Sequence, residues 1–151
     1  MKIEAVNKTI WVPLTPPRAF ELFAAQLPSW WPQETHSLSA GQNTKPKSMA
    51  VDARKGGEIT ETLADGSTST WGHFSHYDPP AGLEISWHVG RTPKEATRVA
   101  VRFDAEKDGT RLHLTHDGWE ALGADGQGTR DGYNGGWVGV LARFEDHAKT
   151  G

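Results

Sequence analysis

Apolar and polar residues alternate along the middle of the chain. The clearest example is residues 83–89, where Leu, Ile, Trp and Val occupy every second position and Glu, Ser and His lie between them. This period of two is typical of a strand with one buried face. Turn signals, of which Asp65-Gly66 is the strongest, separate successive strands by the length of a hairpin. The pattern predicts an antiparallel meander with strands at about 49–53, 58–63, 69–77, 83–89, 98–104 and 111–115.

The segment before this meander combines one strand with a helix. Residues 3–12 alternate loosely and predict an edge strand. Thr15, followed by two prolines, is typical of a helix N-cap, and Ala and Phe residues within 19–24 then fall at helical spacing. Pro28 is predicted to end this helix, and a short second turn or bend is expected at 30–32.

The end of the chain has the periodicity of one long amphipathic helix, predicted at about 129–149. Two aperiodic polar segments, 33–47 and 123–128, are predicted to be loops. The second loop is rich in glycine and borders the helix, which makes it a candidate gate for a cavity. The apolar stripe of the helix is Tyr133, Trp137, Val140, Leu141, Phe144 and Ala148.

These elements predict a single α+β domain over residues 1–151. A sheet with one apolar face needs a cover, and the C-terminal helix is the long cover available. We therefore expect a curved antiparallel sheet of about six or seven strands wrapped on that helix. Such a sheet leaves room beside the helix, and a cavity there is where a small ligand binds.

Composition and charge narrow the function classes. The chain has no cysteine, which excludes disulfides and thiol chemistry. The net charge is -3 and no basic stripe is present, so nucleic acid is not an expected partner. Neither a signal peptide nor an apolar run of about 18 residues is found, so we expect a cytoplasmic protein without membrane insertion. Nothing indicates a cofactor, and a homodimer stays open.

Four stretches, taken in order, carry a resemblance. They are Ala19-Phe20-Glu21-Leu22-Phe23 with Trp30-Trp31-Pro32, Trp71-Gly72-His73-Phe74 with Tyr77-Asp78-Pro79-Pro80, Thr115-His116-Asp117-Gly118-Trp119, and Gly136-Trp137-Val138-Gly139-Val140-Leu141. Together they resemble the START-like (SRPBCC) superfamily and its branch named after the activator of the heat-shock-protein-ninety ATPase. The resemblance implies a helix-grip fold, as in the birch-pollen allergen, with a hydrophobic cavity. It implies no single function, because this scaffold hosts lipid carriers, cyclases and cochaperones.

The histidines offer two interpretations. No spacing among the seven matches a metal site, so no metal is predicted. His116 follows the last strand, where it either forms a structural hydrogen bond or orients and protonates a ligand. His88 is the second candidate for such a catalytic role.

Aromatic residues are the strongest indication of a ligand. The chain has 7 Trp, and an indole ring combines a large apolar area with one N–H group. The alternative is that these side chains close the core and leave no space. The predicted ligand-binding residues are Trp30, Trp31, Phe74, Trp87, Phe103, His116, Trp119, Tyr133 and Trp137.

Three functions remain. The leading hypothesis is a small-molecule binding protein for an apolar or aromatic ligand. The second is a cyclase or hydratase that acts on a polyketide-like substrate, with His116 or His88 as general acid or base. The third is an adaptor similar to the cochaperones, which requires an exposed apolar patch.

Overall fold

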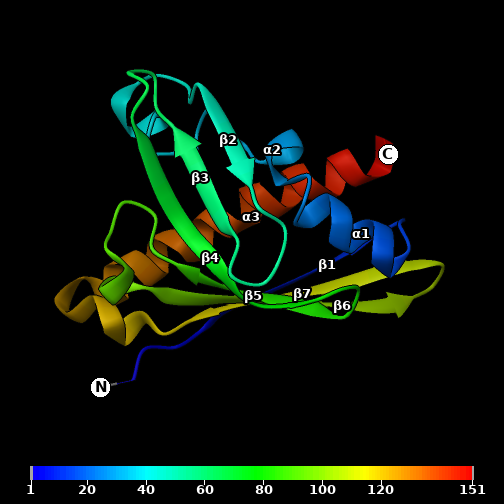
Figure 1. Cartoon of the computed structure of the whole chain (residues 1–151). Helices are drawn as coiled ribbons and strands as arrows, with labels where there is room; N and C mark the ends of the chain where they lie inside the picture. The colour runs from blue at the N-terminus through cyan, green and yellow to red at the C-terminus, as the bar shows by residue number, and fades with distance from the viewer. Residues whose placement is uncertain (1, 151) are drawn as a thin grey trace.

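The computed structural model describes residues 2–150 and shows an antiparallel sheet that grips a long C-terminal helix (Figure 1). Its seven strands have the order β1-β7-β6-β5-β4-β3-β2, and the predicted helix-grip fold is confirmed. The elements are β1 Val6–Val12, α1 Pro16–Phe23, α2 Leu27–Trp30, η1 Ala40–Gln42, β2 Ser48–Val51, β3 Glu58–Thr62, β4 Thr68–Asp78, β5 Gly82–Trp87, η2 Pro93–Glu95, β6 Thr97–Glu106, β7 Gly109–Asp117, η3 Trp119–Asp125 and α3 Gly126–Thr150.

Two irregularities bend the sheet around α3. The register between β3 and β4 shifts at Ile59/Thr60, and the register between β4 and β5 shifts at Phe74/His76. A bulge of this kind increases the local twist of a strand and bends it. In Figure 1 the upper part of β4 accordingly rises with β2 and β3, away from the flatter region formed by β5, β6 and β7.

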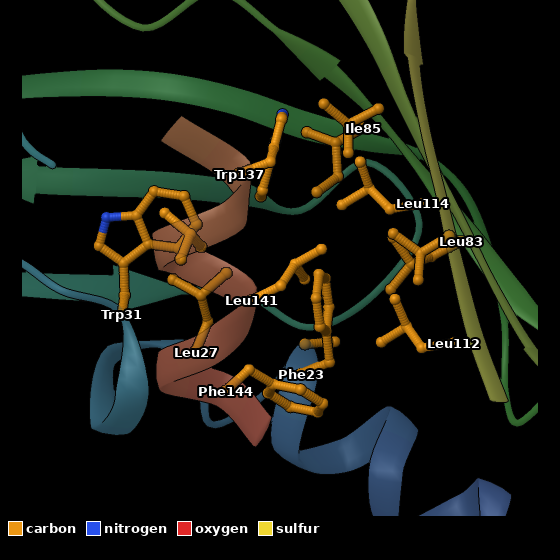
Figure 2. Packing of buried hydrophobic residues seen from close by; sticks show 14 of the residues in the cluster. Phe23, Leu27, Trp31, Leu83, Ile85, Leu112, Leu114, Trp137, Leu141 and Phe144 are labelled. Carbon is orange, nitrogen blue, oxygen red and sulfur yellow. The ribbon is translucent and has the colours of Figure 1, made fainter. Parts of the chain in front are cut away.

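The core lies between α3 and the concave face of the sheet. Figure 2 shows Leu141 and Phe144 of α3 facing Leu83 of β5 and Leu112 of β7, with Phe23 of α1 between them. The rings of Phe23 and Phe144 meet edge to face, with centroids 5.3 Å apart. All five side chains are at most 2% exposed. Burial of each is worth about 1.5–3 kcal/mol, so this layer is what holds α3 on the sheet.

Two sequence predictions about the helices are wrong. Pro28 does not end the first helix: α1 ends at Phe23, and Pro28 lies in the first turn of α2, where a missing N–H breaks no bond. The segment 123–128 is not a gating loop, because it contains the end of η3 and the start of α3. A Cβ at Gly126 would lie 2.6 Å from the Trp119 carbonyl oxygen, so this glycine lets α3 begin in contact with η3.

Candidate functional site

A half-open pocket of about 440 Å³ lies between α3, the sheet and the 33–47 loop. One wall is a face of α3, where the lining positions recur at three and four residues. The opposite wall comes from β4 and β5, and the loop closes one side. The lining residues are Trp31, Thr35, His36, Ser37, Leu38, Trp71, Trp87, Val89, Thr129, Gly132, Tyr133, Gly136, Trp137 and Val140.

Four tryptophans from separate parts of the chain form the apolar wall of this pocket. Trp31 follows α2, Trp71 lies on β4, Trp87 ends β5 and Trp137 lies on α3. The ring of Trp31 is central, with its centroid 5.3 Å from that of Trp71 and 5.9 Å from the other two. All these contacts are tilted or edge to face, the arrangements that aromatic quadrupoles favour. The rings therefore support one another and form a rigid surface.

The indole N–H group of each pocket tryptophan is already bound within the protein. Tryptophan thus presents ring surface to the pocket and directs its polar atom elsewhere. In chain order, the acceptors of Trp31, Trp71, Trp87 and Trp137 are the His36 carbonyl oxygen at 2.6 Å, Glu61 Oε1 at 3.0 Å, the Tyr133 hydroxyl at 3.0 Å and His116 Nδ1 at 3.0 Å.

Two glycines one turn apart, Gly132 and Gly136, lie on the pocket face of α3. A Cβ added at Gly132 would meet no atom within 4 Å, and one at Gly136 would come no closer than 3.8 Å to His36 Nε2. Glycine within a helix costs about 0.5–1 kcal/mol relative to alanine. Packing does not require these two glycines, so their contribution at this site is open space beside the tryptophans.

Glu61 of β3 is fully buried beneath the 33–47 loop and holds the loop on the sheet. The N–H groups of Leu38 and Ser39 donate to its carboxylate at 3.0 and 2.9 Å. The Ser39 hydroxyl and Trp71 Nε1 also donate, at 2.5 and 3.0 Å. Burial raises the pKa of Glu61, but these four hydrogen bonds outweigh it and hold the pKa below its ordinary value. Glu61 is therefore a carboxylate at neutral pH, with the structural role of fixing one side of the pocket.

His116 lies behind the pocket wall and is fully buried. Its Nδ1 accepts from Trp137, and its Nε2 lies 2.7 Å from Thr97 Oγ1. Since Nδ1 accepts, the proton is on Nε2, which donates to Thr97, and the Thr97 hydroxyl donates to the Trp87 carbonyl at 3.3 Å. Burial lowers the pKa of His116 to about 3, against the opposing effect of Asp117. The imidazole is neutral at physiological pH, and both of its nitrogens are occupied.

Tyr133 is the hydrogen-bond donor that α3 places in the pocket. Its hydroxyl oxygen accepts from Trp87 Nε1 at 3.0 Å, and no protein acceptor for its own proton is found within residues 2–150. Burial raises the pKa of Tyr133 above its ordinary value. The hydroxyl therefore stays protonated at neutral pH and can donate to a carbonyl oxygen of a ligand.

The structure divides the nine predicted ligand-binding residues into three groups. Four of them line the pocket, namely Trp31, Trp87, Tyr133 and Trp137. Two form the layer behind it: the ring centroid of Trp119 is 4.0 Å from that of His116 and 5.6 Å from that of Tyr133. His88, the second catalytic candidate, is buried beside the pocket but does not line it.

The remaining three, Trp30, Phe74 and Phe103, lie in the core and line no part of the pocket. The rings of Trp30 and Phe103 pack on Phe23, at centroid distances of 5.2 and 5.9 Å. Phe74 packs on the Tyr77 ring at 5.3 Å. The aromatic pattern of the sequence therefore did not distinguish core residues from pocket residues.

Sequence reasoning did not select Trp71, Glu61 or the two pocket glycines. Trp71 and Phe74 are both buried although their positions differ by three, an odd number, because the register shifts of β4 interrupt its period of two. Gly72 was the available signal, since a glycine within a strand often marks a bulge or a close approach of backbones. A Cβ at Gly72 would lie only 2.0 Å from the Ser86 carbonyl oxygen.

Among the residues that the structure describes, no three His, Asp or Glu side chains are grouped so as to hold a metal ion. Within residues 2–150, no helix combines the length and the apolar composition that a bilayer crossing requires. The prediction that the chain uses no metal stays a prediction.

Comparison with known proteins places this fold in one family. Among curated protein sequences, none matches the chain. Of the solved structures, the anthrahydroquino-gamma-pyrone synthase Txn09 is 26% identical, with a TM-score of 0.67 over 96% of this chain and 97% of the synthase. The Aha1 dimer from Colwellia psychrerythraea is 15% identical, with a TM-score of 0.67 over 95% of each chain.

A third similar structure is DynU16, from the dynemicin biosynthetic locus. It is 14% identical, with a TM-score of 0.64 over 98% of this chain and 48% of its own. At these identities Aha1 and DynU16 show the fold alone. The model of the family described as activator of Hsp90 ATPase homolog 1-like protein matches residues 13–149. With nearly its whole length matched, the chain belongs to the family of activator of Hsp90 ATPase homolog 1-like proteins.

Proposed function

We propose that the chain binds a planar aromatic small molecule between the four pocket tryptophans and the glycine-containing turn of α3. One observation carries this proposal: the pocket wall consists of indole rings whose N–H groups are already bound. A ligand on this wall meets apolar π surface. An acyl chain would gain only from burial there, whereas a flat ring gains from burial and from stacking.

The size of the pocket and one relative support this ligand class. A volume of about 440 Å³ lies within the range of roughly 300–1,000 Å³ that is usual for small-molecule sites. Txn09, at 26% identity, is named as the synthase of an anthrahydroquino-gamma-pyrone, which is a fused-ring compound. That activity belongs to Txn09, and it favours fused rings over lipids as the first ligands to test.

Native mass spectrometry of freshly purified protein, followed by titration with naphthalene, anthraquinone and oleate, tests the proposal. Two variants add the same side chain to α3, one inside the pocket and one outside it. Gly136→Leu fills the pocket, whereas Gly139→Leu adds leucine at an exposed position with free space. We expect naphthalene and anthraquinone to bind in preference to oleate, with at least tenfold weaker binding in Gly136→Leu alone. Equal affinity in the two variants, or no binding by the unmodified protein, contradicts the proposal.

A ring-closing enzyme is the second candidate, and two groups in the pocket favour it. Tyr133 offers a proton from α3, and His36 lines the pocket from the loop. His36 Nδ1 lies 2.7 Å from Thr35 Oγ1, which leaves Nε2, the nitrogen nearest Gly136, available. In an aldol-type closure, Nε2 would take a proton from the carbon beside a carbonyl, and Tyr133 would donate to the developing oxyanion.

His116 does not suit this role, because both of its nitrogens are engaged and its pKa is about 3. The test is turnover of a linear polyketone thioester by His36→Ala and Tyr133→Phe. Loss of turnover in both variants, with naphthalene affinity unchanged, supports the enzyme. Turnover equal to that of the unmodified protein in both variants removes it.

We do not propose the adaptor function. It requires an exposed apolar patch, and within residues 2–150 the exposed large hydrophobic residue is Val138 alone, at 59%. The cytoplasmic location and a homodimer stay predictions.

A further inference from the structure

A second and smaller hollow, of about 80 Å³, adjoins the pocket beyond the end of β5. The two spaces share Trp87, Val89, Thr129 and Tyr133, so they meet at the hydrogen bond between Trp87 and Tyr133. Polar and charged side chains are concentrated in the smaller space, which we call the polar hollow. Its other lining residues are His88, Arg91, Glu95, Thr97, Trp119 and Leu122.

His88 is the unusual member of the polar hollow. The side chain is only 6% exposed. Its Nδ1 is the one buried side-chain nitrogen or oxygen of residues 2–150 without a hydrogen-bond partner. A buried polar atom that lacks a partner costs about 1–3 kcal/mol. By contrast, the polar atoms of the buried residues around it are satisfied: the Thr97 hydroxyl lies 2.7 Å from His116 Nε2 and donates to the Trp87 carbonyl.

The charges in the polar hollow favour a neutral partner for His88. Arg91 already pairs with Glu95 at 3.1 Å and with Asp125 at 3.6 Å. Two carboxylates thus face one guanidinium, which leaves no uncompensated positive charge for an anion. A hydroxyl group both donates and accepts, so it satisfies His88 Nδ1 in either tautomer.

We propose that the polar hollow receives a hydroxyl group carried by the aromatic ligand, with His88 Nδ1 as its hydrogen-bond partner. The proposal rests on the proposed function, because the ring of the same ligand occupies the tryptophan-lined pocket. It narrows the ligand class to hydroxylated aromatic compounds. Tyr133 lies where the two spaces meet, so its hydroxyl is next to the path of the ligand hydroxyl.

Naphthalene and 2-naphthol form a matched pair of probes, because they differ by one hydroxyl group. The quantity to measure is the ratio of their dissociation constants. We expect 2-naphthol to bind more tightly than naphthalene to the unmodified protein, and the preference to fall about tenfold in His88→Phe. His76→Phe, which changes an exposed histidine outside both spaces, should leave the ratio unchanged.

The outcomes separate this inference from the proposed function. Binding of both probes with the same ratio in all three proteins overturns the inference and leaves the proposed function standing. Binding of neither probe overturns both. Because His88→Phe can fail to fold, the ¹⁵N resonances of the imidazoles in the unmodified protein give a second measurement. The His88 Nδ1 resonance should shift on addition of 2-naphthol and not of naphthalene, and no shift contradicts the inference.

Discussion

Trp137 Nε1 donates a hydrogen bond to His116 Nδ1 across 3.0 Å, and this contact joins the pocket wall to the layer behind it. The bond orients the indole on α3 and at the same time places the imidazole proton on Nε2. Protonation of His116 would place two N–H groups opposite each other. The geometry of the pocket wall is therefore linked to the charge of one buried histidine.

The first prediction follows from this link. The pKa of His116 is about 3 in the folded chain, below its ordinary value of 6.5, because burial disfavours the charged form. The unfolded chain therefore binds the extra proton between these values. The stabilisation is present in full above pH 6.5 and is lost as the pH falls toward 3. From pH 6.5 to 5, before most carboxylates titrate, this amounts to about 1–2 kcal/mol.

Urea denaturation at pH 6.5 and pH 5 measures this loss. In His116→Gln the decrease in the free energy of unfolding over the same interval should be smaller by about 1–2 kcal/mol. Equal decreases in the two proteins would show that His116 titrates normally in the folded chain.

The second prediction concerns Trp137 itself. The side chain is 2% exposed between α3 and the sheet, so Trp137→Ala should lower the free energy of unfolding by about 3–5 kcal/mol. Trp137→Phe retains most of the apolar area but leaves His116 Nδ1 without its donor, at a cost of about 1–3 kcal/mol. Chemical denaturation of both variants measures the loss in the free energy of unfolding for each. A cost below about 1 kcal/mol for the alanine variant would refute this account of the packing.

The third prediction concerns the glycines of α3. Gly136→Ala should raise the free energy of unfolding by about 0.5–1 kcal/mol, because the added methyl group meets only an ordinary contact with His36. Gly135→Ala, outside the pocket, should stabilise the chain equally. Thermal unfolding gives the comparison. A decrease in stability for Gly136→Ala alone would show that packing requires the glycine there.

The fourth prediction concerns the attachment of the 33–47 loop. Glu61→Gln replaces one acceptor oxygen by an NH₂ group that faces N–H and O–H donors, and we expect a loss of about 2–4 kcal/mol. In the variant, the Leu38 and Ser39 amides should then exchange hydrogen faster than they do in the unmodified protein, and this increase should exceed that of amides in the central strands. Glu58→Gln, at an exposed position of the same strand, should have little effect. Unchanged exchange at Leu38 and Ser39 would contradict this role of Glu61.

The helical and strand periodicities of the sequence were sufficient to predict the architecture, because each reports which face of an element is buried. They could not separate the core from the pocket wall. Trp30 ends α2, whereas Trp31 has extended backbone, with φ -60° and ψ 132°. The two adjacent indoles contact each other, with ring centroids 5.8 Å apart, but Trp30 packs on Phe144 in the core whereas Trp31 lines the pocket.

The hydrogen-bond partners of the buried polar residues could not be predicted from the sequence either. The alternation of β3 predicts that Glu61 lies in a strand but says nothing of its hydrogen-bond partners. Those partners lie 22 and 23 residues away in the loop and 10 residues away at Trp71. Whether a histidine is catalytic or structural likewise depends on the groups that face it. The bonds of His116 to Trp137 and Thr97 come from elements about 20 residues away on either side.

The position of β1 at the edge of the sheet has a consequence for how the chain acquires its structure. Within residues 2–150, β1 pairs only with β7, from Val6 opposite His116 to Val12 opposite Thr110. β1 must therefore wait for about a hundred further residues to be synthesised before its partner exists. Joining ends so far apart also carries a large entropic cost. Until β7 emerges, both edges of β1 are open to pairing with other chains, and pairing with β7 then covers one of the two.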